Sequence, residues 1–311
     1  MTQASDPSRF HWSPATDPNQ SLRATLEPLD QLVNQAHQKL IICAAPRTMS
    51  SSFCAALYAA GLGVPEEYFS PQFTKKIKGH WHAQMDNSNR PVSMAAFVEE
   101  LCVKRSWDGL FATKLLFDQF ERWLTNPCGR ALFEGATIVM LCRADLRGQV
   151  VSLATADTYK VFGSTEGEHP AKTSPLPQDR IIDSAFYRTM RAEVGWRAFF
   201  AFSGNQPTLI TDTMLKQDLS GTLRALAASL GRPINEEGLA AYSETSRRYG
   251  VHADHKAAME ASIDDDFTSH AFDASSYRKL ALPRPGYSRW KRLQDWYSGR
   301  LKANEKQQRG N

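Results

Sequence analysis

Short apolar runs alternate with helical patterns along the middle of the chain. The runs at residues 39–45, 109–115, 136–142 and 207–211 are each short and apolar, which predicts β-strands. The segments between them repeat apolar residues at helical spacing. Because such alternation favours a mostly parallel sheet with helices on both faces, we predict an α/β fold.

Helix signals frame the first predicted strand. Apolar residues recur at helical spacing over residues 21–38, which predicts a helix before the strand. After the strand, "SSSFCAALYAAGLG" offers a serine N-cap, an alanine-rich apolar face and Gly61 at the point where a helix would stop. We therefore predict a second helix that begins at these serines and ends near Gly61.

The chain of 311 residues is long enough for one large domain or two small ones. We predict a single domain over 1–311, with a helical extension up to about residue 38 and a helical region from about residue 232 to the end. Residues 163–178, "GSTEGEHPAKTSPLPQ", form a polar loop that contains prolines. Such a loop can be a lid over a site or a plain surface connection.

Composition and charge limit the class of protein. The sequence is 42% hydrophobic and 23% charged, as in soluble globular proteins, and it has no apolar run of the roughly 18 residues that a membrane span needs. Its first residues lack the basic and then apolar pattern of a signal peptide, so we expect a cytoplasmic protein. The net charge of +4 is too small to indicate a nucleic-acid partner but suits an anionic ligand.

Cysteine and histidine spacing gives no indication of a metal site. The five cysteines are scattered and never spaced as C-x-x-C, which argues against a zinc site or a disulfide framework. "HWH" places His80 and His82 on one side of an extended segment, but no third ligand stands at a suitable spacing. We expect these two histidines to line a pocket for an acceptor substrate and to bind no metal.

The stretch "KLIICAAPRTMSSSF", residues 39–53, has the pattern of a buried strand followed by a turn and a helix. In an open parallel sheet, ligands bind beyond the carboxyl ends of the strands, where a helix N-terminus offers free amides to an anion. Arg47 would add a fixed charge, and Ser50 and Ser51 would add hydroxyl donors. The alternative is that the serines only cap the helix and that Arg47 is a solvated surface residue.

The predicted strand 136–142 distinguishes between these alternatives. In a phosphate-loop kinase or ATPase, such a strand ends in an aspartate that orders Mg²⁺, whereas here it is followed by Arg143. Gln149 and Ser152 follow within about two helical turns and add polar groups. Two anion sites without a metal ligand suggest a nucleotide with phosphates at separate positions, as in 3′-phosphoadenosine 5′-phosphosulfate (PAPS). A sulfuryl group can be transferred from PAPS with arginine, lysine and backbone amides as the stabilising groups.

Five segments in the same order resemble the bacterial PAPS-dependent sulfotransferases typified by trehalose 2-sulfotransferase. The resemblance runs with gaps from about residue 39 to about residue 231. The segments are "APRTMSSSF", "GLGVPEEYFS", "GLFATKLLFDQF", "CRADLRGQVVSL" and "VGWRAFFAFSGNQPTLITDTML". It implies a P-loop-like three-layer sandwich with a mostly parallel central sheet flanked by helices.

The resemblance also implies roles for individual residues. Arg47, Ser50 and Ser51 fall where the family binds the 5′-phosphosulfate, and Arg143 falls where it binds the 3′-phosphate. Ser152 is the expected polar partner of Arg143, with Gln149 as an alternative. The complete donor-binding set is Arg47, Thr48, Ser50, Ser51, Ser52, Arg143, Gln149 and Ser152.

Catalytic roles follow from the same alignment. Glu67 falls on the position of the general base, and Glu66 falls on a variable one. Lys114 aligns with a family lysine and, with Arg47, would neutralise charge on the leaving phosphate. From the residues alone, Glu67 could equally be a helix cap or a surface carboxylate, and Lys114 a lysine that snorkels at a strand end. Glu67 would meet the acceptor together with His80 and His82.

These observations predict a metal-independent sulfotransferase that moves a sulfuryl group from PAPS to a hydroxyl of a carbohydrate or another small metabolite. Met49 departs from the family pattern, since it stands where the family usually has glycine. One alternative is therefore a protein that binds PAPS or its bisphosphate product without catalysis. Another is a nucleotide kinase, which would need a Gly-Lys-Ser/Thr loop and a metal carboxylate that the sequence lacks. The oligomeric state stays open, with a homodimer as one option.

Overall fold

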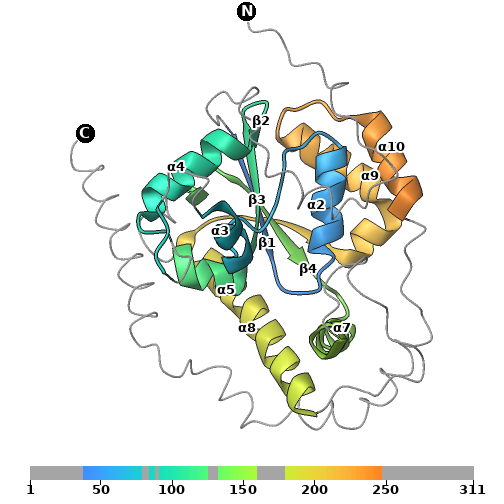
Figure 1. The fold of residues 1–311 in the computed structure, drawn as a ribbon. Coiled ribbons are helices and arrows are strands. Elements are labelled where there is room, and N and C mark those ends of the chain that lie inside the picture. The colour runs from blue at the N-terminus through green and yellow to red at the C-terminus, as the bar shows by residue number, and fades with distance from the viewer. Residues whose placement is uncertain (1–37, 79–83, 88–90, 125–131, 160–178, 247–311) are drawn as a thin grey trace, which may run out of the picture.

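The structure is a computed structural model, and it describes residues 38–78, 84–87, 91–124, 132–159 and 179–246. Its middle layer is a five-stranded sheet in the order β2-β3-β1-β4-β5 (Figure 1). Among these five strands, β2 pairs antiparallel with β3, and the other neighbouring strands pair parallel. The strands are β1 (Gln38–Ala44), β2 (Ser106–Trp107), β3 (Leu110–Leu116), β4 (Thr137–Cys142) and β5 (Thr208–Thr211).

Helices cover both faces of this sheet (Figure 1). One face carries α2 (Ser50–Ala59), α9 (Asp212–Ser229) and α10 (Glu236–Ser246). The other face carries α3 (Pro71–Ile77), α4 (Met94–Arg105), α5 (Phe117–Gln119), the π-helix η2 (Phe120–Leu124) and α8 (Asp179–Ser203). Helix α7 (Leu146–Tyr159) follows β4 and packs against α8.

The central strand β1 shows why two helical layers form. Its side chains point alternately to the two faces, as in any strand. Leu40 and Ile42 are buried with α2, α9 and α10, whereas Ile41 and Cys43 are buried with α3, α4 and α8. An apolar run without polar positions therefore suits a strand that is covered on both sides.

The predicted fold class and the four predicted parallel strands are confirmed. The predicted serine N-cap is wrong, because the cap residue of α2 is Met49 in a left-handed conformation. Gly61 follows the end of α2 with a φ of 75°, as the prediction requires of a glycine at a helix end. Except for Gln38, which begins β1, the helix predicted over 21–38 lies outside the described residues, as does the whole of the loop 163–178. The single-domain organisation stays a prediction.

Within the described residues, no helix combines the length and apolar character needed to cross a membrane.

Helix α8 approaches the end of β3 closely at a glycine. A Cβ on Gly195 would lie 2.1 Å from Cζ of the buried Phe117 ring. Gly195→Ala should therefore destabilise the fold, since overpacking costs about 1–3 kcal/mol or more and outweighs the roughly 1 kcal/mol that alanine gains in a helix. Thermal unfolding should show a melting temperature lower by several degrees.

Val194→Ala provides the control for this prediction, because Val194 is the neighbouring residue on α8 and is 55% exposed. Its melting temperature should stay within about one degree of the wild-type value. An unchanged melting temperature for Gly195→Ala would contradict the packing of Phe117 against α8.

Candidate functional site

The loop between β1 and α2 has a strained backbone. Arg47 and Met49 have φ values of 66° and 61°, in the left-handed region that favours glycine. A left-handed residue other than glycine costs roughly 1–2 kcal/mol, so the surroundings must hold this loop in place. The structure thus explains why glycine suits position 49, and it shows that Met49 adopts the same kind of conformation.

Three side chains bind the backbone of this loop. Gln149 of α7 donates to the Pro46 carbonyl at 2.7 Å, and Arg143 donates from Nη1 to the Arg47 carbonyl at 3.3 Å. Thr48 donates from its hydroxyl to the Ala45 carbonyl at 2.9 Å. Carbonyl groups that are held in this way fix the direction of the neighbouring amides.

The first turn of α2 presents groups that suit an anion. The cap residue Met49 supplies no side-chain cap, so the amides of the first turn have no partner from that side chain. The helix dipole adds positive potential at the same place. Ser51 and Ser52 are exposed, whereas Ser50 is buried. These are features that an anion site at this turn would require, and the site itself stays a prediction.

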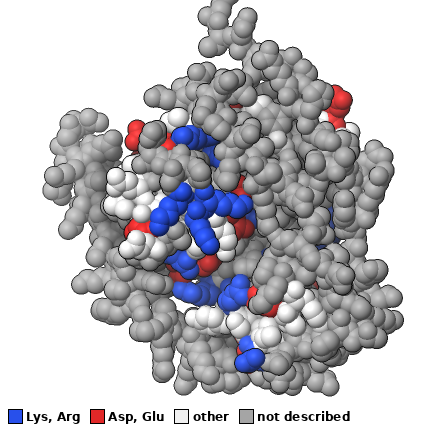
Figure 2. All heavy atoms as spheres, in the orientation of Figure 1, with Lys and Arg blue, Asp and Glu red and all other residues white. Residues whose placement is uncertain are grey.

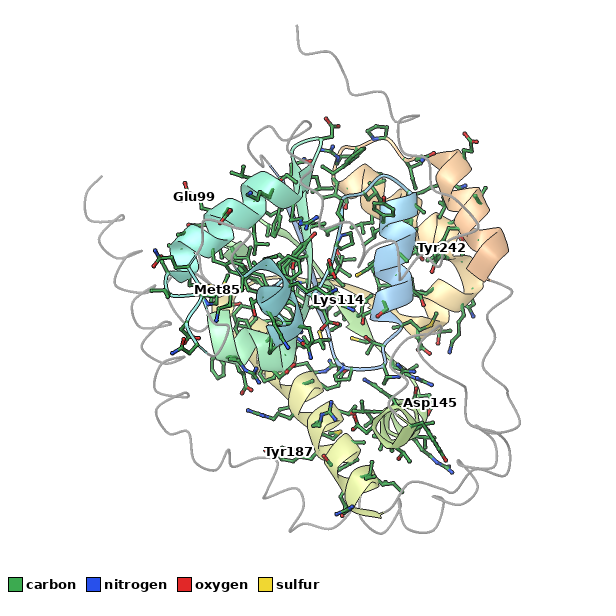
Figure 3. All side chains as sticks on the ribbon, viewed as in Figure 1. Met85, Glu99, Lys114, Asp145, Tyr187 and Tyr242 are labelled. Carbon is green, nitrogen blue, oxygen red and sulfur yellow. The ribbon has the colours of Figure 1, made fainter. Side chains whose placement is uncertain are left out.

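A buried lysine lies beside this turn. Lys114 of β3 is only 9% exposed, and Figure 3 shows it between α2 and α3. Its ammonium group donates to Ser51 Oγ at 3.1 Å and pairs with Glu67 Oε1 at 2.8 Å. Burial alone would lower the pKa of Lys114, but attraction to the Glu67 carboxylate and the hydrogen bond to it leave that pKa above its usual value. Lys114 is therefore a fixed positive charge.

Glu67 reaches this lysine because the segment before α3 runs along β3. Glu66 forms an isolated parallel bridge with Thr113, and its carbonyl accepts from the Lys114 amide at 3.0 Å. The adjacent Glu67 side chain is 31% exposed, so it remains accessible to a substrate. Helix α3 is capped by Ser70, which means that Glu67 is not its cap.

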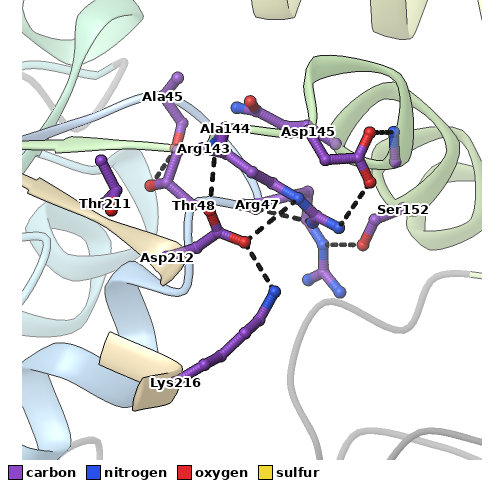
Figure 4. A network of polar contacts seen from close by, with 12 residues as sticks. Ala45, Arg47, Thr48, Arg143, Ala144, Asp145, Ser152, Thr211, Asp212 and Lys216 are labelled. Atoms are coloured by element: carbon purple, nitrogen blue, oxygen red, sulfur yellow. Dashed lines mark hydrogen bonds and ion pairs between the residues drawn. The ribbon is translucent and has the colours of Figure 1, made fainter. Parts of the chain in front are cut away.

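The second candidate anion site lies beyond β4, next to the loop (Figure 4). Arg47 donates from Nε to Ser152 Oγ of α7 at 2.9 Å. Burial and the nearby Arg143 charge lower the pKa of Arg47, while Asp157 acts in the opposite direction. Two guanidinium groups that repel each other in a partly buried place would be stabilised by an anion between them.

Asp212, the first residue of α9, holds Arg143 from the other side (Figure 4). Its Oδ2 lies 3.9 Å from Arg143 Nε and 2.6 Å from Lys216 Nζ, and its Oδ1 accepts from the Ala144 amide at 3.0 Å. Burial would raise the pKa of Asp212. The hydrogen bonds from Lys216 and the Ala144 amide, together with the positive charges of Lys216 and Arg143, lower it instead. Asp212 is therefore an ionised anchor.

Among the residues coloured in Figure 2, Lys and Arg side chains gather near the middle of the face shown.

The structure brings most of the predicted residues together at the carboxyl edge of the sheet, but it groups Arg47 differently from the prediction. The Arg47 side chain lies with Ser152, a residue predicted for the 3′-phosphate, while Ser51 lies with Lys114. Gln149 is fully buried and bound to the loop backbone. Of the two residues predicted as the polar partner of Arg143, Ser152 is therefore the more accessible. His80 and His82 lie outside the described residues.

Sequence reasoning missed two residues of this region. Gln119 donates from Nε2 to Glu67 Oε2 at 2.7 Å, and Asp212 anchors Arg143. Gln119 comes three residues after β3, and Asp212 comes directly after β5. Their positions just after predicted strands were the one sequence feature that could have indicated them as site residues.

In the part of the chain that the structure describes, no group of three His, Cys, Asp or Glu side chains could hold a metal ion. Of the five cysteines, Cys43, Cys54 and Cys142 are buried and form no disulfide among the described residues, and Cys102 is likewise unpaired and partly buried. Cys128 lies outside the described residues.

Comparison with known proteins identifies the family of the chain. No curated protein matches the chain. Residues 39–247 match the family model described as Stf0 sulphotransferase, and this match covers more than half of the 311 residues. It includes the loop after β1, Glu67, Lys114 and the arginine after β4. The chain therefore belongs to the Stf0 sulphotransferase family.

Proposed function

We propose that this sulphotransferase moves a sulfuryl group from PAPS to a hydroxyl of a carbohydrate or another small metabolite, with Glu67 as the general base. The observation that carries the proposal is the contact of Glu67 with Lys114 and of Lys114 with Ser51, at the first turn of α2. These contacts support the proposal, because they join the proposed base, a lysine and the helix end proposed to bind the anion.

The donor would lie across the carboxyl edge of the sheet. The amides of the first α2 turn, with Ser51 and Lys114, would hold the 5′-phosphosulfate, and Arg143 with Ser152 would hold the 3′-phosphate. Arg47 would lie between them, because its backbone belongs to the loop and its side chain contacts Ser152. Thr48, Ser50 and Ser52 would contribute through the loop backbone, and Gln149 by bracing that loop.

In the proposed reaction, the acceptor hydroxyl oxygen attacks sulfur and its proton passes to the Glu67 carboxylate. A new oxygen–sulfur bond forms, and the bond between sulfur and the bridging phosphate oxygen breaks. The electron pair of that bond leaves with adenosine 3′,5′-bisphosphate, whose added negative charge is stabilised by Lys114 and the helix amides. A transferring sulfuryl group carries less charge than a phosphoryl group, so these residues suffice without a metal ion.

The acceptor would approach from the exposed side of Glu67. We further propose that it is a small molecule or glycan, with His80 and His82 in the acceptor pocket, and that nucleic acid is not a partner. We also propose that the protein acts in the cytoplasm.

Nucleotide binding tests the two anion sites. Adenosine 3′,5′-bisphosphate should raise the melting temperature more than AMP or ATP does, because only the bisphosphate places a phosphate at each site and binding to the native state stabilises it. The measurement is thermal unfolding with each nucleotide at equal concentration, with EDTA and with Mg²⁺. Equal shifts for the three nucleotides, or a shift that needs Mg²⁺, would count against the proposed donor.

A further inference from the structure

The turn after β3 carries the buried side-chain amide of Gln119, which has no role in the reaction proposed so far. Gln119 ends the short helix α5, and the π-helix η2 begins at the next residue, Phe120. Short π-helical segments are frequent at functional sites. Gln119 is only 4% exposed, so its polar groups must find partners inside the protein.

Both ends of the Gln119 amide have such partners. Its Oε1 accepts from the Leu116 amide at 3.3 Å, and its Nε2 donates to Glu67 Oε2 at 2.7 Å. An ionised carboxylate only accepts hydrogen bonds, and a backbone amide only donates. The amide orientation in the structure is therefore the one that satisfies both partners.

The turn itself is supported by an aromatic cluster. The rings of Phe117 and Phe120, on either side of Gln119, both pack on the buried Trp196 of α8, with centroids 5.4 and 5.1 Å from it. Trp196 in turn donates from Nε1 to the Ala44 carbonyl at the end of β1. Gln119 thus extends from a rigid part of the core toward the site.

Glu67 is consequently held at both oxygens from different sides. Lys114 binds Oε1 and Gln119 binds Oε2, so rotation of the carboxylate would break at least one contact. A carboxylate oxygen carries two lone pairs, so a contact to each oxygen does not exhaust the capacity of Glu67 to accept hydrogen bonds. A second lysine in place of Gln119 would also hold the carboxylate, but its charge would weaken the base.

We propose that Gln119 is a positioning residue of the sulfuryl transfer, which fixes the Glu67 carboxylate in the orientation that receives the acceptor proton. This inference rests on the proposed role of Glu67 as the base. In this proposal Gln119, a neutral donor, orients the Glu67 carboxylate, and Lys114 stabilises the charge of the leaving phosphate.

Other ionisable groups near Glu67 bear on the test. Lys114 and Glu66 lie close to it, and the Cys54 thiol of α2 is within electrostatic reach of both glutamates. Burial raises the pKa of Cys54 to about 12, so this thiol stays neutral over the range of the assay. A change in the acidic part of the pH profile would therefore report on the carboxylates.

The test is the pH dependence of transfer from ³⁵S-labelled PAPS by Gln119→Met, a variant of similar shape without the donor. Glu67 acts only when ionised, so activity falls as the pH drops through its pKa. Loss of the hydrogen-bond donor to ionised Glu67 raises the pKa of Glu67. The acid limb, meaning the acidic side of the pH–activity profile, should therefore move to higher pH by about one unit. Turnover at the plateau should fall about 10-fold, with bisphosphate affinity unchanged within two-fold.

Gln119→Glu gives a second measurement in case Gln119→Met does not fold. Two adjacent carboxylates share a proton, so its acid limb should move further in the same direction. Asp118→Asn, at an exposed residue of the same turn, is the control and should keep the wild-type profile. A purely structural role would lower the melting temperature without moving the acid limb, and that result would overturn the proposal.

A failure of the underlying function looks different. If Glu67→Gln kept wild-type turnover, the base itself would be wrongly assigned, whatever Gln119 does. If Glu67→Gln is inactive but both Gln119 variants keep the wild-type acid limb, only the positioning role is wrong.

Discussion

The Glu67→Gln variant should bind adenosine 3′,5′-bisphosphate within a few-fold of the wild-type affinity while its turnover falls by about 10²-fold or more. The amide keeps the size of the side chain, so it can still lie between Lys114 and Gln119. It cannot accept the acceptor proton as the new oxygen–sulfur bond forms. Calorimetric binding and a transfer assay with ³⁵S-labelled PAPS measure the two effects separately.

Glu66→Gln is the matched control, because it makes the same change one residue earlier. Glu66 takes part in the bridge to β3 through its backbone, which the substitution preserves. Its turnover should stay close to the wild-type value. If Glu67→Gln remained as active as Glu66→Gln, the base would lie elsewhere, and His80 and His82 would be the next candidates.

The second large effect concerns the arginine after β4. Arg143→Ala should weaken binding of adenosine 3′,5′-bisphosphate by about 10–100-fold, since hydrogen bonds to charged groups contribute roughly 1.5–3 kcal/mol. AMP lacks the 3′-phosphate, so its affinity should fall much less. Arg143 also binds the Arg47 carbonyl, which makes the ratio of the two affinities the informative quantity.

Titration calorimetry with both nucleotides gives this ratio. The control is Arg224→Ala, which removes an exposed arginine that pairs with Glu236 on the helical layer formed by α9 and α10. Both affinities should be unchanged in that variant. A preference for the bisphosphate over AMP that survives in Arg143→Ala would show that the 3′-phosphate binds elsewhere.

The sequence sufficed for the parts of the fold that depend on local patterns. β1, β3 and β4 were predictable because each is a short apolar run that is buried on both faces, whereas β5 is short and partly exposed. The position of Arg143 beside the loop after β1 was predictable because the carboxyl ends of parallel strands share one edge of the sheet. The helix start at the serines was predictable, but its cap residue was misassigned, since nothing in the serines reveals that Met49 adopts a left-handed conformation.

The contacts between distant segments were beyond the sequence. The Arg47 side chain turns toward Ser152, more than 100 residues away in the sequence, and this rotamer depends on how α7 packs. Gln119 and Asp212 act through partners on other elements, so neither forms a local motif. Their roles follow only from the tertiary arrangement of the strand ends.

The central claim is that this chain transfers a sulfuryl group from PAPS with Glu67 as the base. Incubation of the full chain with ³⁵S-labelled PAPS, EDTA and fractions of an extract of the source organism tests it most directly. Label should appear in a hydroxyl-bearing acceptor together with an equal amount of adenosine 3′,5′-bisphosphate, and Glu67→Gln should lose this transfer. Tight binding of the bisphosphate without label transfer to any fraction would contradict it and would favour a protein that binds the nucleotide without catalysis.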